Sequence, residues 1–237
     1  MIENRKNISR RDFLKMSGSI ILGLFLSGCQ LKESEQSNPT PISISEPTIQ
    51  SIPTATLSAC MARAYFGDPQ DSEYILPYPI GERYRVLQTY CEANGSHADQ
   101  LAYDFEMPIG ADVIAARSGE ARLFQDNKPD KSVMENIGEY NYIYIEHEDG
   151  TVAFYAHLQQ DSIVLVRYGE YVEVGQLIAK SGNSGFTAGK PQLHFGLYQY
   201  YPARDGYDMA VNFRNADGVL DENGGLMRGR YYEALPY

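Results

Sequence analysis

The sequence is poor in basic residues, in cysteine and in long apolar runs. Its 237 residues include 20 Lys or Arg, 31 Asp or Glu and 3 Cys. No apolar run approaches the roughly 18 residues that a membrane-spanning helix needs, which excludes such a helix. The remaining composition, 43% hydrophobic and 22% charged, fits one ordinary globular domain with some additional unstructured length.

The shortage of basic residues argues against nucleic acid as a partner. Without residues 1–28, interpreted below as a cleaved leader, the chain keeps 15 basic and 29 acidic residues, a formal net charge of −14. Such a surface repels phosphate backbones and gains nothing from counterion release. Attraction to an anionic membrane surface is disfavoured for the same reason.

The N-terminus has the pattern of an export signal. Five basic residues within positions 1–15 precede residues 16–28, which are mostly apolar or small and too few to span a bilayer. Residues 9–15 (Ser-Arg-Arg-Asp-Phe-Leu-Lys) resemble the twin-arginine signature, and residues 26–29 (Leu-Ser-Gly-Cys) resemble a lipobox. These resemblances imply a signal peptide over residues 1–28 and a lipidated Cys29 that anchors an exported protein to the outer face of a bacterial membrane. The alternative is a non-cleaved signal anchor with an incidental cysteine.

The segment after Cys29 is predicted to be a linker. Residues 30–58 contain four Pro, six Ser and four Thr and show no apolar period. Such a composition buries too little surface to offset the entropy of ordering. We therefore expect a Ser/Thr/Pro-rich tether over residues 29–58, with a reach of about 30 Å as a flexible coil, and a folded domain over residues 59–237.

Cys60 and Cys91 are the remaining cysteines. In an oxidising exterior they most simply form a disulfide. A thiolate metal ligand at Cys91, close to His97, is the alternative.

Beyond residue 80 the local signals are those of strands and tight turns, without a convincing amphipathic helix. Residues 140–146 place three tyrosines on one face and Asn141, Ile143 and Ile145 on the other, as in a half-buried strand. Asp149 and Gly150 then supply a hairpin turn. Further strands are expected over residues 151–158, within residues 166–179 and over residues 191–198. The sequence therefore predicts an all-β fold.

The candidate chemistry rests on only four histidines, His97, His147, His157 and His194. Taken singly, each is more often a surface or core residue than a ligand. However, zinc hydrolases use three protein ligands and leave one position for water, and two histidines with one aspartate suit that purpose. In a strand, His194 and Gln192 point to the same face.

Several motifs together resemble the lysostaphin-like (LytM-type) zinc metallopeptidases, which cut peptide cross-links of bacterial cell walls. The similarity covers about residues 75–215, and the segments that carry it are residues 97–104, 107–116, 143–150, 155–158, 172–178, 181–185 and 192–195. The resemblance implies antiparallel β-sheets in a sandwich of the duplicated-hybrid-motif type. It also implies that the substrates are stem or cross-bridge peptides of peptidoglycan.

Carried over to this chain, the resemblance makes His97, Asp104 and His194 the ligands of Zn²⁺ and His157 a catalytic histidine. His147 matches a position that is not a ligand and is interpreted as structural. The family's His-x-His motif reads Gln192-Leu193-His194 here, so Gln192 occupies the place of the second catalytic residue. An amide can hydrogen-bond but cannot transfer the proton, and the loss of that transfer typically costs 10²–10⁴-fold in rate unless His157 or a carboxylate replaces it.

Two function classes remain open. The first is a working zinc endopeptidase, and the second is a zinc-binding module that holds wall peptides or regulates another wall hydrolase. The open fourth position of a three-ligand site favours the first class.

Residues 126–140 and 217–237 are expected to form the walls of the groove that binds the substrate. Five tyrosines near these segments have two possible roles: they stack on the sugar or peptide of a substrate, or they pack half-buried in the sheet. They are Tyr140, Tyr142, Tyr198, Tyr200 and Tyr201.

Overall fold

A computed structural model describes residues 58–132, 138–165, 167–202 and 206–237. The predicted signal peptide, the lipidated Cys29 and nearly all of the predicted linker lie outside these residues. Within the described part, no helix is both long and apolar enough to cross a membrane.

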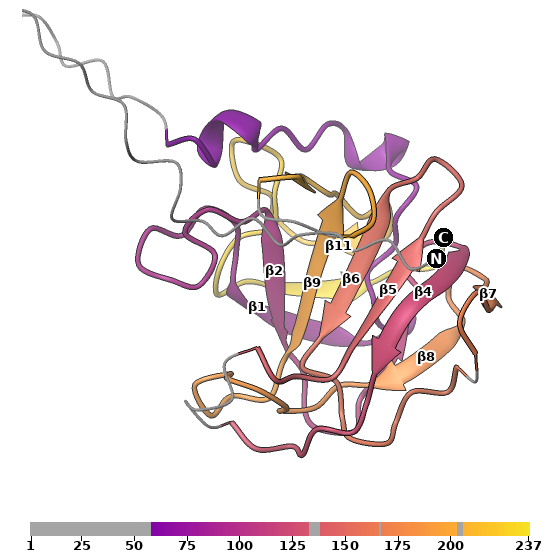
Figure 1. Ribbon diagram of the computed structural model, residues 1–237. Coiled ribbons are helices and arrows are strands. Elements are labelled where there is room, and N and C mark those ends of the chain that lie inside the picture. The colour runs from indigo at the N-terminus through magenta and orange to yellow at the C-terminus, as the bar shows by residue number, and fades with distance from the viewer. Residues whose placement is uncertain (1–57, 133–137, 166, 203–205) are drawn as a thin grey trace, which may run out of the picture. The chain divides into compact units, whose positions relative to one another are not determined.

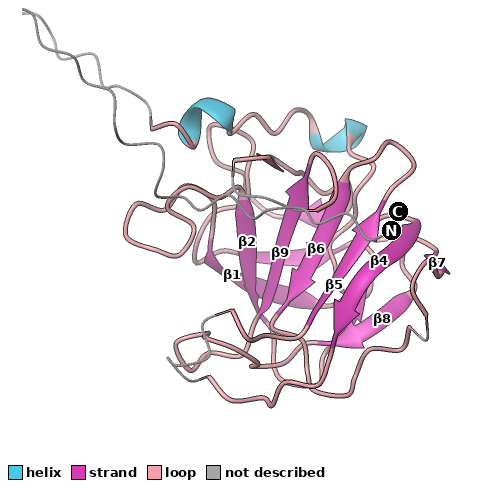
Figure 2. Cartoon of the chain, in the orientation of Figure 1, coloured by secondary structure: helices cyan, strands magenta, loops and turns pink. Residues whose placement is uncertain are grey.

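Antiparallel strands make up most of the ordered structure, and two short 3₁₀-helices lie at one end of the molecule (Figure 2). No α-helix occurs in the described ranges. The prediction of an all-β, antiparallel fold is confirmed. The elements are η1 (Met61–Arg63), η2 (Pro69–Asp71), β1 (Arg83–Gln88), β2 (Ala102–Glu106), β3 (Asp112–Ile114), β4 (Gly119–Gln125), β5 (Tyr142–Glu146), β6 (Val152–Ala156), β7 (Tyr171–Val172), β8 (Leu177–Lys180), β9 (Leu193–Tyr198), β10 (Asp208–Met209), β11 (Ala216–Asp217) and β12 (Tyr231–Ala234).

Ten strands form one large sheet, and β3 pairs with β8 in a small one. The order in the large sheet is β11-β12-β1-β2-β9-β6-β5-β4-β7, with β10 paired to β9. Figure 1 shows β2, β9, β6, β5 and β4 side by side. The central strand β9, late in the sequence, thus lies between β2 and β6, which places chemistry from both halves of the domain on one surface.

The two faces of the large sheet differ in character because successive side chains alternate between them. One face forms the core, where Phe105, Ile143, Tyr155 and Phe195 are fully buried. The tyrosines on that side satisfy their hydroxyls, as when the Tyr155 hydroxyl accepts a hydrogen bond from the Ala116 backbone N–H at 2.9 Å. The opposite face, called here the open face, carries Asp104, His194 and a group of aromatic side chains.

The predicted alternation of residues 140–146 is confirmed on strand β5. Asn141, Ile143 and Ile145 are completely buried, whereas Tyr142 and Tyr144 are half-buried on the open face. The following turn contains Gly150, whose N–H donates to the His147 carbonyl at 2.9 Å and whose φ of 83° suits glycine. The hairpin that joins β5 to β6 therefore forms where Asp149 and Gly150 predict it.

A disulfide joins Cys60 to Cys91, as the sequence predicts. Cys91 lies in the long connection between β1 and β2, and its N–H donates to the Gln100 carbonyl at 3.0 Å. The alternative of a metal-binding thiolate at Cys91 is therefore wrong. The bond ties the segment before the sheet to the loop that carries His97.

Removal of this bond is expected to destabilise the domain. For cysteines with a sequence separation of 31, the chain-entropy model gives a loss of about 3–4 kcal/mol for Cys60→Ala/Cys91→Ala. Denaturant unfolding of the double variant against the oxidised protein measures this loss. An unchanged unfolding midpoint would show that the loop is held by its other contacts alone.

Candidate metal centre

Three predicted ligands come together on the open face. Asp104 lies on β2 and His194 on β9, and the strand pairing places them directly opposite each other. His97 comes from the β1–β2 connection. Its Nδ1 donates to the carbonyl of Thr89, which directly follows β1, at 3.1 Å. The three residues are separated by up to 97 positions in the sequence, and the sheet topology brings them together.

The three inward-facing atoms form a small triangle. His194 Nδ1 lies 2.9 Å from Asp104 Oδ1 and 3.2 Å from His97 Nε2, and His97 Nε2 lies 3.4 Å from Asp104 Oδ1. A tetrahedral ion with bonds of about 2.0–2.1 Å has ligand atoms about 3.3–3.4 Å apart. The triangle therefore has the size of one face of such a coordination shell, and these residues could hold a metal ion.

The surroundings orient the ligand atoms. His97 Nδ1 donates to a backbone carbonyl, so Nε2 is the atom that presents a lone pair to the site when the ring is neutral, the usual arrangement of a metal-binding histidine. Burial alone would raise the pKa of Asp104, but the two histidines outweigh burial and hold its pKa far below the usual range. Asp104 is thus ionised, and the donor set suits a divalent cation.

A cavity of about 590 Å³ opens beside the triangle. Five aromatic side chains line it, those of Tyr140, Tyr144, Phe154, Phe186 and Tyr198. Among the described residues that line it there is no Lys or Arg. The three candidate ligands therefore border a mainly aromatic cavity without basic side chains in its described lining.

His157 lines this cavity and is held in a fixed orientation. It follows β6 directly, with a φ of 63° that non-glycine residues rarely adopt and that often marks functional sites. Its Nδ1 donates to the Ser184 carbonyl at 2.8 Å. Burial lowers the pKa of His157, and nearby His194 lowers it further. The ring is therefore neutral at neutral pH, with Nε2 as an acceptor.

Gln192 lies in the same cavity, one residue before β9. Its backbone N–H donates to the Gly182 carbonyl at 3.2 Å, which fixes the start of the strand. Its side-chain amide makes no hydrogen bond to any described residue, so it is available to a ligand. The sequence prediction that Gln192 and His194 share one face agrees with this arrangement.

His147 lies apart from the cavity with the metal ligands. It is 3% exposed, its Nδ1 donates to the Ser118 carbonyl at 2.9 Å, and its ring packs edge-on against Tyr74. Burial lowers its pKa to about 4. This environment fits the structural role predicted for His147.

Some features of the site have no signal in the sequence. Thr89 and Ser184 orient the two histidines through backbone carbonyls, which any residue possesses. Of the two predicted walls, the loop before β5 contributes Gly138 and Tyr140 to the cavity. The tail does not, because residues 231–234 pair with β1 instead, and no residue after 217 lines the cavity in the described ranges.

Three candidate ligands beside a cavity have the arrangement that is typical of a catalytic metal site, since structural zinc sites usually close all four positions with protein ligands. Residues 99–210 match the family model described as Peptidase family M23. Asp104, His157, Gln192 and His194 lie inside the match, and His97 lies two residues before it. This part of the chain is therefore similar to peptidase family M23.

Two named relatives are similar to about half of this chain. The chain is 30% identical over 126 residues to Peptidoglycan DD-endopeptidase ShyA of Vibrio cholerae, covering 51% of this chain and 26% of the relative. It is 32% identical over 120 residues to lysostaphin of Staphylococcus simulans, covering 50% of this chain and 19% of the relative. The chain thus spans less than a third of the length of these relatives.

Solved structures of similar proteins include the NMR solution structure of lysostaphin. It is 22% identical, with a TM-score of 0.43 over 64% of each chain. A zinc-containing peptidase from Vibrio cholerae is 28% identical, with a TM-score of 0.39 over 53% of this chain and 37% of that one.

Proposed function

We propose that this protein is a zinc-dependent endopeptidase that cleaves peptides of peptidoglycan at the cell envelope. The observation that carries the proposal is the triangle of His97, Asp104 and His194 beside a cavity that also contains His157 and Gln192. The family match and the peptidoglycan endopeptidases among the relatives support it.

The metal would be held by His97 Nε2, Asp104 Oδ1 and His194 Nδ1. When bound, it supplies a Lewis acid that polarises the substrate carbonyl and lowers the pKa of water toward about 7. His157 contributes through Nε2, because its Nδ1 is committed to the Ser184 carbonyl. That nitrogen accepts a proton from the attacking water and, once protonated, donates to the developing oxyanion.

Gln192 can contribute hydrogen bonds but, unlike His157, cannot transfer a proton. Its amide N–H donates a hydrogen bond to the substrate carbonyl or to the oxyanion, but it carries no titratable proton. His157 is therefore the only neutral imidazole in the described cavity that is left free of the metal. The domain is expected to cleave slowly for a member of this class.

Purified wall peptides test the proposal. The zinc-loaded protein is expected to release new amino termini from cross-linked peptides, to stop when a chelator removes the metal and to recover when zinc is added. Metal analysis of the same sample should give about one zinc per chain. No product from several types of wall peptide at full zinc occupancy would contradict the proposal.

One observation favours a second candidate function, a binding or regulatory module. Gln192 occupies the position that the family resemblance gives to a catalytic histidine, while the metal ligands are intact. Such a module binds zinc and wall peptide without turnover. The same assay distinguishes the two, because calorimetry then detects peptide binding in a sample that releases no product.

Anchoring by a lipid at Cys29 is the proposed localisation, and the leader and lipobox patterns of residues 1–29 support it. In cells that export the protein, Cys29→Ala is expected to move it from the membrane fraction to the soluble fraction, since the linker itself has no affinity for lipid. Immunoblots of the two fractions measure the shift. Cys29→Ser is the matched control for side-chain size, and unchanged membrane association in both variants would contradict lipidation.

A further inference from the structure

An aromatic surface extends from the metal site across the open face. Tyr144 stacks on Phe154, with ring centroids 4.6 Å apart and an interplanar angle of 21°. Tyr142 and Tyr201 contact the Tyr144 ring at 5.5 and 5.9 Å, and Tyr140 adjoins Tyr142 at 6.0 Å. Phe154 also meets the ligand His194 edge-on at 5.7 Å. The aromatic surface is thus continuous with the metal centre.

The tyrosines of this surface differ from those of the core in their hydroxyl groups. Core tyrosines use theirs within the protein, as when the Tyr78 hydroxyl donates to the Tyr232 carbonyl at 2.9 Å. The hydroxyls of Tyr142, Tyr144 and Tyr201 make no hydrogen bond to any residue in the described ranges. Tyr201 is 36% exposed, and Tyr142 and Tyr144 are half-buried. This surface therefore offers stacking rings together with free donors and acceptors.

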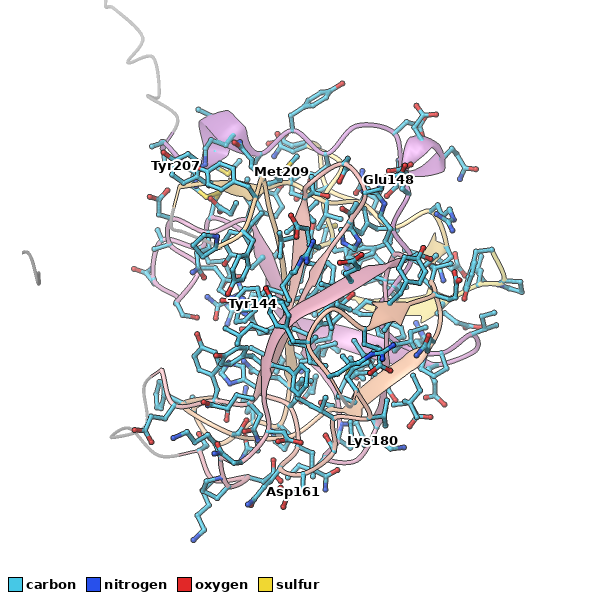
Figure 3. All side chains as sticks on the ribbon, turned by 45° about the vertical axis from the view of Figure 1, so that its right-hand side comes forward. Tyr144, Glu148, Asp161, Lys180, Tyr207 and Met209 are labelled. Carbon is cyan, nitrogen blue, oxygen red and sulfur yellow. A yellow bond between two sulfur atoms is a disulfide. The ribbon has the colours of Figure 1, made fainter. Side chains whose placement is uncertain are left out.

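Strand pairing fixes how far the surface lies from the metal centre. Asp104, His194, Ala156 and Tyr142 form one row across β2, β9, β6 and β5. Strand β5 is two positions from β9, or about 10 Å at the usual strand spacing. Figure 3 labels Tyr144 on this strand, near the middle of the view. An extended peptide covers about 3.3–3.6 Å per residue. A substrate whose scissile bond lies at the metal site therefore reaches β5 about three residues from that bond.

We propose that this aromatic surface binds a neutral N-acetylated sugar ring attached to the peptide substrate. A pyranose ring has an apolar C–H face that stacks on an aromatic ring and hydroxyl and amide groups that pair with free tyrosine hydroxyls. The absence of Lys and Arg from the described cavity lining suits an uncharged group. This inference rests on the proposed function, because wall stem peptides are joined to such a sugar a few residues from the cross-link.

The test compares two substrates that differ only in the sugar. One is a cross-linked wall-peptide dimer that carries its disaccharides, and the other is the same dimer after the disaccharides are removed. The zinc-loaded protein is expected to prefer the sugar-bearing dimer by about tenfold in kcat/KM. Tyr142→Ala, which removes a ring, and Tyr144→Phe, which removes only a hydroxyl, should each lower that ratio toward one.

Tyr65→Ala is the matched control, because Tyr65 is 85% exposed and does not line the cavity. It should keep the wild-type ratio. Equal cleavage of both dimers by the wild type, or a preference that survives in both tyrosine variants, would overturn the inference and leave the proposed function intact. If neither dimer is cleaved, the proposed function fails, and calorimetric binding decides the inference: tighter binding of the sugar-bearing dimer supports it, and equal or absent binding overturns it.

Discussion

His194→Ala is expected to remove metal binding and peptide cleavage together. The substitution deletes the ligand atom that lies within 3.2 Å of both other ligands and leaves only His97 and Asp104. A metal supplies several kcal/mol of transition-state stabilisation, so its loss lowers the rate by roughly 10³-fold or more. Metal analysis of the purified variant and the peptide assay measure the two losses.

His147→Ala is the matched control for His194→Ala. Both histidines are buried and both occur in the sheet region, so each substitution leaves a cavity of similar size. His147, however, contacts Ser118 and Tyr74 and none of the ligands. The control is expected to lose stability but to keep about one zinc per chain. A zinc content that stays near one in His194→Ala would remove the assignment of the site.

The second large effect is expected at the two residues that flank the metal in the cavity. His157→Ala should lower the rate by about 10²–10⁴-fold, because among the described residues that line the cavity it removes the one imidazole that is not a candidate metal ligand. Gln192→His should raise the rate by about one to two orders of magnitude, since it restores a titratable group beside His194. Initial rates against purified wall peptide measure both changes.

The pH dependence of kcat shows whether a faster Gln192→His variant owes its rate to proton transfer or only to better packing. Gln192→His should add a titration with a pKa near that of histidine to the kcat profile, and Gln192→Met should not. Gln192→Met also reports how much the amide contributes by hydrogen bonding. If Gln192→His leaves the rate and the profile unchanged, the difference between glutamine and histidine at this position does not limit the reaction.

Several elements of the fold could be predicted from local sequence, and others could not. The hairpin of β5 and β6 follows from the alternation of residues 140–146 and from Gly150. Strand β4 lacks a clear signal in the sequence because a bulge between Ala121 and Leu123 interrupts the alternation of buried and exposed residues. Strands β1 and β12 contain mainly Arg, Tyr and polar residues, and their pairing with each other depends on contacts distant in sequence.

Some features of the candidate site could likewise be predicted from local sequence, and others could not. Gln192 and His194 share a face because they are two residues apart in a strand. The direct pairing of Asp104 with His194 joins residues separated by 90 positions, and only the family resemblance indicated it. The backbone carbonyls of Thr89 and Ser184 could not be predicted at all, because their positions depend on the completed loops.

Because Asp104 and His194 lie opposite each other on β2 and β9, the three candidate ligands come together only when these two strands are correctly aligned. If β9 slipped by one residue against β2, Leu193 or Phe195 would lie opposite Asp104 and His194 would turn into the core. A misaligned sheet therefore has only two of the three ligands within reach of one ion. Since a metal stabilises only the states that bind it, zinc added during refolding is expected to favour the native alignment over its nearest competitors if these three residues bind it.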